Sequence, residues 1–297
     1  MNDKIIYLNG EFVKESEAGI SPMNRGLMYG DGLFETFRGY QGKVFALENH
    51  YRRLKDSAHF LSIALPFTEQ ELSAILTRLL DINDLLLSDS RIRLTLIRGG
   101  SPSGLLPSGN GESMVIISAE GVPASMEKIQ QNGIKLSILK NYKIDHLSPL
   151  ASRKTINYIS GILGMMEIRE NGGDEGIYLN HDGHLVEGIT SNIFIVKGDR
   201  LYTPSLSSGL LPGITRDTVL EVAVQLGIAC EEKNLSPDDL FQAEEVFITS
   251  SVREVVPATG VDERIFSVGP VTRKIQKGYK GYVATYFSNI DKMSASE

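Results

Sequence analysis

Two hydrophobic periods alternate along the first part of the chain. Apolar residues recur every three to four positions over 47–61, which predicts a helix, and the capping sequence Thr-Glu-Gln-Glu at 68–71 opens a second run of the same period. Residues 90–98 alternate between apolar and polar, which predicts a strand, and 33–40 is interpreted as another. Asn9-Gly10 lies between two short apolar runs and predicts a β-hairpin, because both turn positions require positive φ.

The second half of the chain combines short strands with helices. Turn sequences separate short apolar runs, which predicts two hairpins that pair 176–179 with 184–186 and 192–196 with 201–203. Helical periodicity predicts three helices, over 159–168, 215–226 and 270–287. Because strands and helices are mixed without regular βαβ alternation, the pattern favours an α+β fold over a doubly wound parallel sheet.

Segment 120–133 separates the two halves. It contains a proline and a polar run, and it has no clear hydrophobic period. We therefore predict an N-terminal domain over 1–119, an interdomain linker over 120–133 and a C-terminal cofactor-binding domain over 134–297. Segment 99–113 is a long loop rich in Gly, Pro, Ser and Asn, and loops of this length in compact domains are often functional.

The composition narrows the class of protein. Hydrophobic residues make up 41% of the chain and charged residues 23%, as in ordinary soluble globular proteins. A formal charge of −7 does not favour nucleic acid as a partner, and no apolar run reaches the length of a membrane span. The N-terminus lacks the apolar core of a signal peptide. The single cysteine, Cys230, excludes an intramolecular disulfide and fits a reducing compartment, so a cytoplasmic protein is predicted.

Lys154 lies just before the predicted helix 159–168 and is the first candidate for catalysis. A lysine amine becomes a nucleophile only when a dry site removes its proton, and it can then also act as a general acid or base. The alternative is a surface lysine near a helix start, which is the more common case. Asn157 and Tyr158 complete a Lys-x-x-Asn-Tyr motif around it.

Two further motifs follow Lys154 along the chain. Glu187 begins a Glu-Gly-x-x-Ser-Asn sequence that ends at Asn192, and Gly213-Ile214-Thr215 lies at the start of a predicted helix. The N–H groups at a helix start, together with the helix dipole, favour a phosphate dianion. The alternatives are an exposed acid at a strand end for Glu187 and an ordinary N-cap for Thr215.

In this order, the three motifs resemble those of the fold-type IV pyridoxal 5′-phosphate (PLP) enzymes. That family holds the branched-chain and D-amino-acid aminotransferases and 4-amino-4-deoxychorismate lyase. The resemblance implies a small α/β N-terminal domain, a larger C-terminal domain with barrel-like β structure, PLP as cofactor and a homodimer.

The resemblance also implies roles for individual residues. Lys154 would form the Schiff base, and Glu187 would pair with the pyridine nitrogen and hold the ring as an electron sink. Arg53, in a His-x-x-Arg-Leu motif, would contact the phosphate, although its place beside the apolar stripe of its helix predicts a surface residue. Further cofactor contacts are implied for Tyr158, Asn192, Gly213, Ile214, Thr215, Ser250 and Ser251, with Ser251 favoured over Ser250.

The substrate pocket is less clearly marked than the cofactor motifs. Candidate pocket residues are Tyr29, Phe34, Arg38, Arg98 and Val252, and core packing is the alternative for Phe34. In D-amino-acid aminotransferases, the loop that corresponds to the segment after Arg98 carries an arginine and a histidine that trap the substrate carboxylate. The matching positions here are Ser103 and Leu105. The Tyr-x-Arg of the branched-chain type is not evident either. Four arginines stay open as carboxylate ligands: Arg91, Arg93, Arg98 and Arg253.

The predicted function is PLP-dependent transfer of an amino group from an amino acid, of the branched-chain or D-amino-acid type, to a 2-oxo acid. The alternative is 4-amino-4-deoxychorismate lyase, which releases pyruvate and p-aminobenzoate, and the Phe-Glu-Thr-x-Arg motif resembles that branch. A non-catalytic PLP-binding relative is a third interpretation, and intact Lys154, Glu187 and Thr215 argue against it. His181-x-x-His184 lies in a predicted turn without a third ligand, so no metal site is predicted.

Overall fold

The computed structural model describes residues 3–100, 104–107, 112–170 and 172–294. The chain forms two compact units, each made of two segments. The N-terminal unit comprises Met1–Val122 and Arg153–Asn157, and the C-terminal unit comprises Pro123–Ser152 and Tyr158–Glu297. Lys154 therefore belongs to the N-terminal unit, although it lies far along the sequence from the rest of that unit.

The N-terminal unit is built on a six-stranded antiparallel sheet with the order β2-β1-β6-β5-β3-β4. Its strands are β1 (Ile5–Leu8), β2 (Glu11–Lys14), β3 (Gly32–Tyr40), β4 (Lys43–Val44), β5 (Ser90–Ile97) and β6 (Met114–Gly121). Its helices are α1 (Arg25–Tyr29), α2 (Leu47–Phe60), α3 (Glu69–Ile82) and the short 3-10 helix η1 (Glu15–Glu17). Asn9 and Gly10 both have positive φ, so the predicted β1–β2 hairpin is confirmed.

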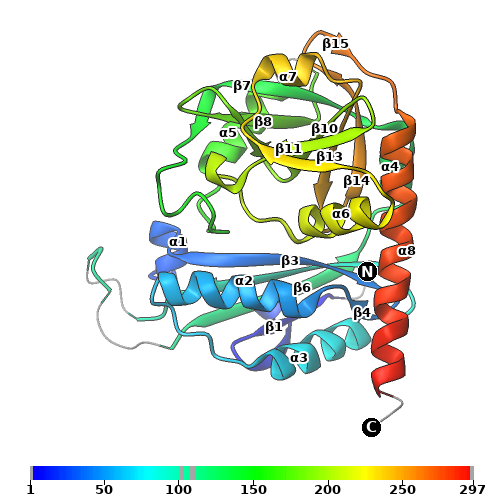
Figure 1. Ribbon diagram of the computed structural model, residues 1–297. Coiled ribbons are helices and arrows are strands. Elements are labelled where there is room, and N and C mark those ends of the chain that lie inside the picture. The colour runs from blue at the N-terminus through cyan, green and yellow to red at the C-terminus, as the bar shows by residue number, and fades with distance from the viewer. Residues whose placement is uncertain (1–2, 101–103, 108–111, 171, 295–297) are drawn as a thin grey trace. The chain divides into compact units, whose positions relative to one another are not determined.

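Helices α2 and α3 pack on one face of this sheet, as Figure 1 shows in blue and cyan. Both helices lie where the apolar period predicts them, and Thr68 and Glu71 form the predicted capping box at the start of α3. Alternate residues of β3, such as Leu33 and Phe37, point into this helical layer and belong to the core. The residues between them, beginning with Phe34, therefore lie on the opposite face of the sheet.

The C-terminal unit contains a nine-stranded mixed sheet with the order β12-β11-β10-β13-β14-β7-β8-β9, and β15 pairs with β14. Its strands are β7 (Ile134–Ile144), β8 (Glu175–Asn180), β9 (Leu185–Gly188), β10 (Asn192–Lys197), β11 (Arg200–Pro204), β12 (Cys230–Lys233), β13 (Glu245–Ser250), β14 (Glu254–Val261) and β15 (Arg264–Ile265). Its helices are α4 (Ser125–Asn132), α5 (Ile159–Glu170), α6 (Ile214–Gln225), α7 (Pro237–Phe241), α8 (Pro270–Ser294) and the 3-10 helix η2 (Leu206–Ser208). Both predicted hairpins, β8–β9 and β10–β11, are confirmed.

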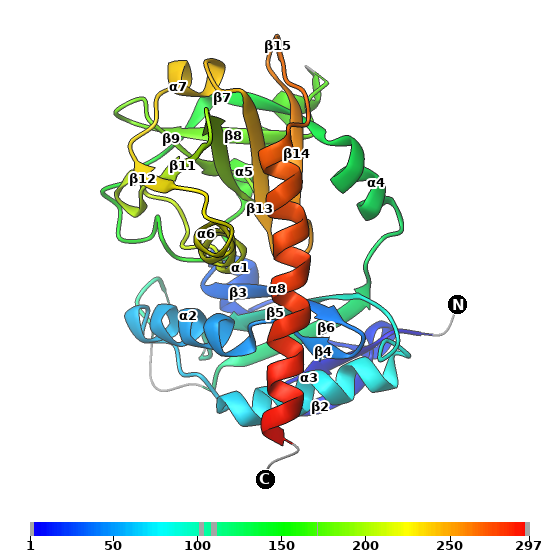
Figure 2. The same ribbon diagram turned by 45° about the vertical axis from the view of Figure 1, so that its right-hand side comes forward.

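Long helix α8 runs along β13 and β14, with α6 beside it (Figure 2). The strands of this unit carry an apolar core that includes Leu136, Ile193, Val246 and Val256. Parallel pairs, such as β7–β8 and β7–β14, lie in one sheet with antiparallel pairs, such as β10–β13. This mixture of sheets and helices confirms the predicted α+β class.

Several elements differ from the sequence-based expectation. Segment 120–133 was expected to be a linker, but it holds α4, whose last turn is anchored to α8, and the boundary between the units falls after Val122. The hydrophobic pattern did not reveal α1, β12 or β14. The division into domains over 1–119 and 134–297 stays a prediction. No helix in the described ranges is long and apolar enough to cross a membrane.

Candidate functional site

The segment that carries Lys154 pairs with the first residues of β3. Phe34 donates its backbone N–H to the carbonyl of Lys154 at 2.9 Å, and Ile156 donates to the carbonyl of Gly32 at 3.1 Å. Thr155 forms an antiparallel bridge with Leu33. Lys154 is therefore held by strand-type hydrogen bonds and not by the helix that follows it in sequence.

Asn157 fixes the end of the lysine segment. Its amide Nδ2 donates to the carbonyl of Gly30 at 3.2 Å. Gly30 has a φ of 65°, and a Cβ added there would lie 2.2 Å from Asn157 Oδ1. A side chain at position 30 would thus strain the backbone and displace Asn157.

The lysine amine lies over an aromatic ring. Lys154 Nζ is 4.4 Å from the ring centroid of Phe34, and the Arg93 guanidinium carbon is 4.0 Å from the same centroid. Phe34 itself is only 4% exposed. The predicted pocket residue Phe34 therefore contacts both the candidate nucleophile and a cation that could meet a carboxylate.

Beneath the same strand lies a buried charged triad. The carboxylate of Glu35 accepts from Arg53 Nε at 2.8 Å and Nη2 at 2.7 Å, and from His50 Nδ1 at 2.8 Å. Burial is the largest influence and raises the pKa of Glu35, but the Arg53 charge and the bonds from His50 and Arg53 outweigh it and hold the pKa well below its usual range. Burial is also the main reason why the pKa of His50 is lowered, with the charges of Arg53 and Lys154 adding to it. Arg53 is not the surface residue that periodicity predicts.

In the C-terminal unit, Glu187 occupies the end of β9. Its carboxylate accepts from Asn192 Nδ2 at 3.2 Å and from the backbone N–H of Leu211 at 3.1 Å. Asn192 Nδ2 also donates to the carbonyl of Leu211 at 3.0 Å. These two donors fix the orientation of the carboxylate. The structure thus brings Glu187 and Asn192 together, as their motif suggests.

Helix α6 begins at Ile214, directly beside this carboxylate. Its N-cap is Gly213, which offers no side-chain cap, so the interpretation of Thr215 as N-cap is wrong. Thr215 lies one residue inside the helix and is 4% exposed. A Cβ at Gly213 would lie 1.9 Å from Asn192 Oδ1, so only glycine fits there. The first N–H groups of α6 are suited to an anion because no side chain caps them.

Ser250 is the last residue of β13, and Ser251 and Val252 lie in the turn that follows. Ser250 Oγ accepts from Arg253 Nε at 3.4 Å. Arg253 also donates to the buried Glu175 and to Thr190, so its guanidinium is engaged in contacts inside the C-terminal unit.

Two tyrosines lie near Glu187 in the same unit. Burial raises the pKa of Tyr178 to about 12, and the neighbouring Tyr158 and Glu187 add to the shift. Tyr158 lies at the start of α5 and is a predicted cofactor residue. Tyr178, on β8, was not predicted, because a tyrosine in a short apolar run is typical of core packing.

Other predicted pocket residues make contacts away from Lys154. Arg98 donates to Asp31 and to the carbonyls of Leu61 and Ser62. Arg38 lies four residues along β3 from Phe34, about 13 Å away at the usual rise per residue, and donates to Asp89 at 2.6 Å.

Tyr29 is the remaining predicted pocket residue of the N-terminal unit, and Ser103 and Leu105 are the two positions compared with the D-amino-acid aminotransferases. Tyr29 ends α1, and its ring centroid is 5.2 Å from the Arg25 guanidinium. Ser103 lies outside the described residues, and Leu105 is exposed.

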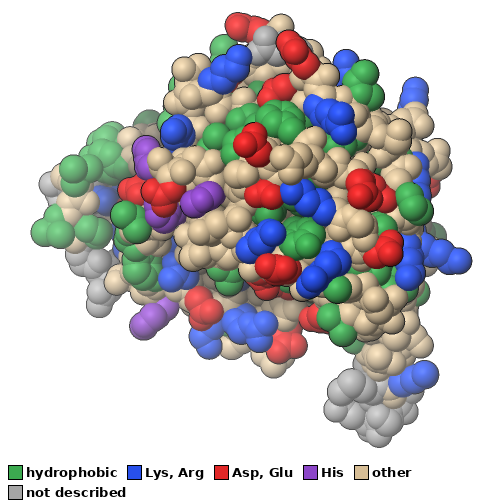
Figure 3. All heavy atoms as spheres, turned by 45° about the horizontal axis from the view of Figure 1, so that its top comes forward, with side chains coloured by type: hydrophobic (Ala, Val, Ile, Leu, Met, Phe, Trp, Pro, Cys, Tyr) green, Lys and Arg blue, Asp and Glu red, His purple; other side chains and the backbone are tan. Residues whose placement is uncertain are grey.

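Several residues of the candidate site escaped sequence reasoning. Glu35 and Glu175 are buried carboxylates whose partners are distant in sequence, so no local pattern marks them. The His-x-x-Arg spacing that holds His50 and Arg53 was the available signal for the triad. Within the described ranges, no group of three or more His, Cys, Asp or Glu side chains is placed to hold a metal. Acidic and basic side chains are interspersed on the face that Figure 3 displays.

Comparison with known proteins adds to this geometry. A family model described as amino-transferase class IV matches residues 32–261. A provisionally named branched-chain-amino-acid aminotransferase of Methanocaldococcus jannaschii is 38% identical over 278 residues, covering 93% of this chain and 95% of the relative. The aminodeoxychorismate lyase of Bacillus subtilis is 33% identical over 280 residues, covering 93% and 94%.

Solved structures give the same picture. The branched-chain amino acid aminotransferase of Escherichia coli superposes with a TM-score of 0.88 at 31% identity, with 95% of each chain covered. A second branched-chain amino acid aminotransferase, from the source abbreviated T.th. and solved with pyridoxamine 5′-phosphate, superposes with a TM-score of 0.85 at 29% identity and the same coverage.

Proposed function

The chain belongs to the class IV aminotransferase family, and on this premise we propose that it transfers an amino group from an amino acid to a 2-oxo acid with PLP as cofactor. When bound, PLP supplies an electron sink that stabilises negative charge on the substrate Cα. The observation that carries the proposal is the placement of Lys154, whose backbone is fixed to β3 and whose amine lies on Phe34.

The residues present fit PLP. Glu187 offers a carboxylate held by two donors, which suits a protonated pyridine nitrogen. The start of α6 has no side-chain cap, and Gly213 leaves no room for one, which suits a phosphate. Thr215 and Ser251 would add hydroxyl donors, and Arg53 a guanidinium already oriented by Glu35.

Lys154 has two tasks in this proposal. Its Nζ would hold the cofactor aldehyde covalently, and with substrate bound the same amine would take the Cα proton as a general base and deliver it onward as a general acid. The Phe34 ring holds the amine and excludes water from one side of it. Arg93, over the same ring, is the arginine that we assign to the substrate carboxylate, in preference to Arg98 and Arg253.

The substrate class separates two reactions. The branched-chain and D-amino-acid types share the transfer reaction, and the amino-acid side chain and handedness are the open variables. Aminodeoxychorismate lyase stays the second candidate, because one relative of that name is 33% identical over nearly the whole chain. In either reaction Lys154 removes the same proton. The reactions would differ afterwards. In transfer, the proton would pass to the cofactor, which would keep the amino group while the substrate leaves as a 2-oxo acid; in the lyase reaction, a group would leave the substrate instead and the cofactor would keep no amino group.

A homodimer is the proposed assembly. Helix α5 exposes an apolar face at i, i+3, i+4 and i+7, made of Ile159, Ile162, Leu163 and Met166. Exposed apolar faces of this kind often mark protein interfaces. Ile162→Glu should shift the mass measured by light scattering from dimer to monomer, whereas Val224→Glu, on the exposed face of α6, should not. Equal masses for both variants would refute the role of α5. A cytoplasmic location is also proposed, supported by the lone Cys230.

A half-reaction tests the proposed function. Single L- and D-amino acids are added to the PLP-loaded protein without any oxo acid, and the visible absorbance of the bound cofactor is followed. Bleaching by one set of amino acids identifies an aminotransferase and its handedness. Pyruvate release from aminodeoxychorismate, without bleaching by any amino acid, identifies the lyase.

The control is Lys154→Ala. This variant should lose the covalently bound cofactor and the half-reaction together, because no other amine is assigned to the aldehyde. A variant that retains full turnover would show that Lys154 is the wrong residue.

A further inference from the structure

One buried carboxylate in the C-terminal unit joins two separate turns. The Glu175 side chain is 2% exposed and accepts from Arg253 Nη2, in the turn between β13 and β14. It also accepts from the backbone N–H of Thr190 at 2.9 Å and from the Thr190 hydroxyl at 2.8 Å, in the turn between β9 and β10. Arg253 Nη2 donates to the Thr190 hydroxyl as well, so the three side chains form a closed network.

The two turns carry the residues that the proposed function assigns to opposite ends of PLP. Glu187 and Asn192 flank the turn that contains Thr190. Ser250 ends β13, and Ser251 lies two residues before Arg253 in the other turn. The distance between the carboxylate for the pyridine nitrogen and the hydroxyls for the phosphate therefore depends on how the two turns are joined.

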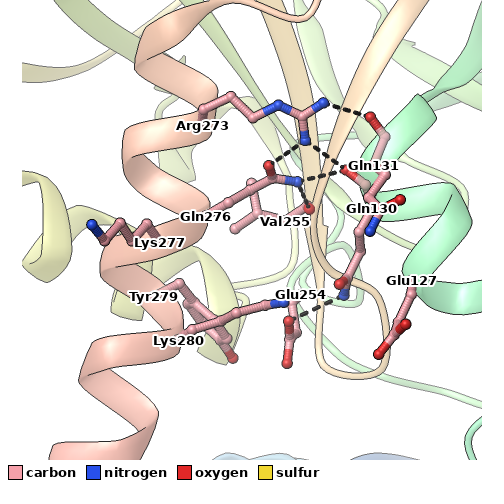
Figure 4. A pocket seen from close by; sticks show the side chains of 10 residues that line it. All are labelled: Glu127, Gln130, Gln131, Glu254, Val255, Arg273, Gln276, Lys277, Tyr279 and Lys280. Carbon is pink, nitrogen blue, oxygen red and sulfur yellow. Dashed lines mark hydrogen bonds between the residues drawn. The ribbon is translucent and has the colours of Figure 1, made fainter.

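Arg253 is held from a second side, through its backbone. Gln130 Nε2 donates to the Arg253 carbonyl at 3.0 Å and to Glu254 Oε2 at 3.1 Å, and Figure 4 shows the Gln130 amide reaching Glu254. Gln130 is itself fixed, because its carbonyl accepts from Gln276 Nε2 at 2.8 Å and from Arg273 Nη1 at 3.2 Å. Gln130, Glu254, Arg273 and Gln276 line a cavity of about 400 Å³ between α4 and α8. The turn therefore has little freedom to move away from Glu175.

The other turn is equally confined. A Cβ at Gly188 would lie 2.2 Å from Ser191 Oγ and 3.2 Å from Glu175 Oε1. Gly188 also donates its N–H to the Ser191 carbonyl at 2.6 Å, which closes the turn tightly. Each turn is thus held by a contact besides those with Glu175.

We propose that Glu175 and Arg253 are a positioning pair that sets the spacing between Glu187 and the hydroxyls of Ser250 and Ser251. Neither residue is assigned a contact with substrate, so the inference deepens the proposed function and rests on it. Small displacements of binding groups weaken ligand orientation strongly, which is why a buried, charge-assisted clamp is suited to this place. Arg253 is thereby excluded as the arginine that binds the substrate carboxylate.

The test compares Glu175→Gln and Arg253→Met with a matched control, Glu245→Gln. Glu245 is also a buried glutamate of this unit, and it accepts from the N–H groups of Val271 and Thr272 and from the Thr272 hydroxyl. The dissociation constant of PLP should rise about tenfold to a hundredfold in the first two variants, the range found when outer-shell partners of ligands are removed. The pH midpoint of the cofactor's visible absorbance should also shift in both. Glu245→Gln should change neither quantity, whatever it costs in stability.

The outcomes are distinguishable. If wild type binds PLP but both variants keep its dissociation constant and pH midpoint, the positioning role is wrong. If Glu245→Gln shifts the midpoint as much as Glu175→Gln, the effect is general destabilisation and the proposal fails. If Glu175→Gln does not fold, Arg253→Met decides the question. Arg253 is 19% exposed, and its replacement leaves only the Glu175 carboxylate without its partner charge. Failure of wild type to bind PLP would overturn the proposed function itself.

Discussion

Replacing Glu35 by glutamine should destabilise the N-terminal unit strongly. The Glu35 side chain is 1% exposed and takes three hydrogen bonds, from Arg53 Nε at 2.8 Å, Arg53 Nη2 at 2.7 Å and His50 Nδ1 at 2.8 Å. A glutamine keeps the shape but removes the charge that offsets the buried guanidinium. Breaking a buried ion pair on one side costs about 3–5 kcal/mol of folding free energy, and that is the expected loss at neutral pH.

The matched control is Glu120→Gln on the same sheet. Glu120 pairs with Lys4 at 3.4 Å and with Arg91 at 3.2 Å, but its side chain is 46% exposed. Exposed pairs contribute about 0–1 kcal/mol, so this variant should unfold close to wild type. Urea unfolding, followed by far-ultraviolet circular dichroism, gives the free energy of unfolding of both variants. The slope of this free energy against urea concentration should be the same in both, which shows that unfolding exposes the same amount of surface.

The pH dependence gives the same reasoning an independent check. In the folded protein the pKa of Glu35 lies below its ordinary value of 4.5. The stability that the carboxylate contributes is therefore fully present above pH 4.5 and is lost as the pH falls below that value. The pKa of His50 is lowered from 6.5, so stability from the neutral ring is lost as the pH falls below 6.5. As the pH is lowered below 4.5, Glu35→Gln should therefore lose less stability than wild type does. A variant as stable as Glu120→Gln at neutral pH, with an unchanged acid limb, would refute the triad as a stabilising element.

Two further substitutions test the site. Gly213→Ala places a Cβ 1.9 Å from Asn192 Oδ1 and should displace Asn192 from Glu187. The free energy of PLP binding, measured by cofactor titration, should weaken by about 2 kcal/mol. Unchanged binding would remove Asn192 from the site. Arg93→Met should lower kcat/KM roughly tenfold to a hundredfold if its guanidinium meets the substrate carboxylate, whereas Arg98→Met should lower stability and leave KM near wild type; the reverse result would exchange the two roles.

Local features of the sequence determined much of the fold. The capping box at Thr68 and the Asn9-Gly10 hairpin depend on residues within a few positions of each other, and both form as expected. Periodicity located α2 and α3 for the same reason, since one face of a helix repeats at short intervals. The short α4 and strand β14 were missed, because few residues carry the period and tertiary contacts decide such elements.

The cofactor motifs were also readable in sequence, since Glu187 and Asn192 flank one short turn and Gly213 precedes a helix close by in the chain. What the tertiary structure alone decided is which groups hold them. Lys154 is fixed by β3, more than a hundred residues earlier in the chain.

Glu175 reaches Arg253 over a separation of 78 residues. Arg53, a surface residue by periodicity, is only 11% exposed because Glu35 faces its helix from the adjacent strand. Partners of this kind are set by strand register and packing across the chain, and a one-dimensional pattern records neither.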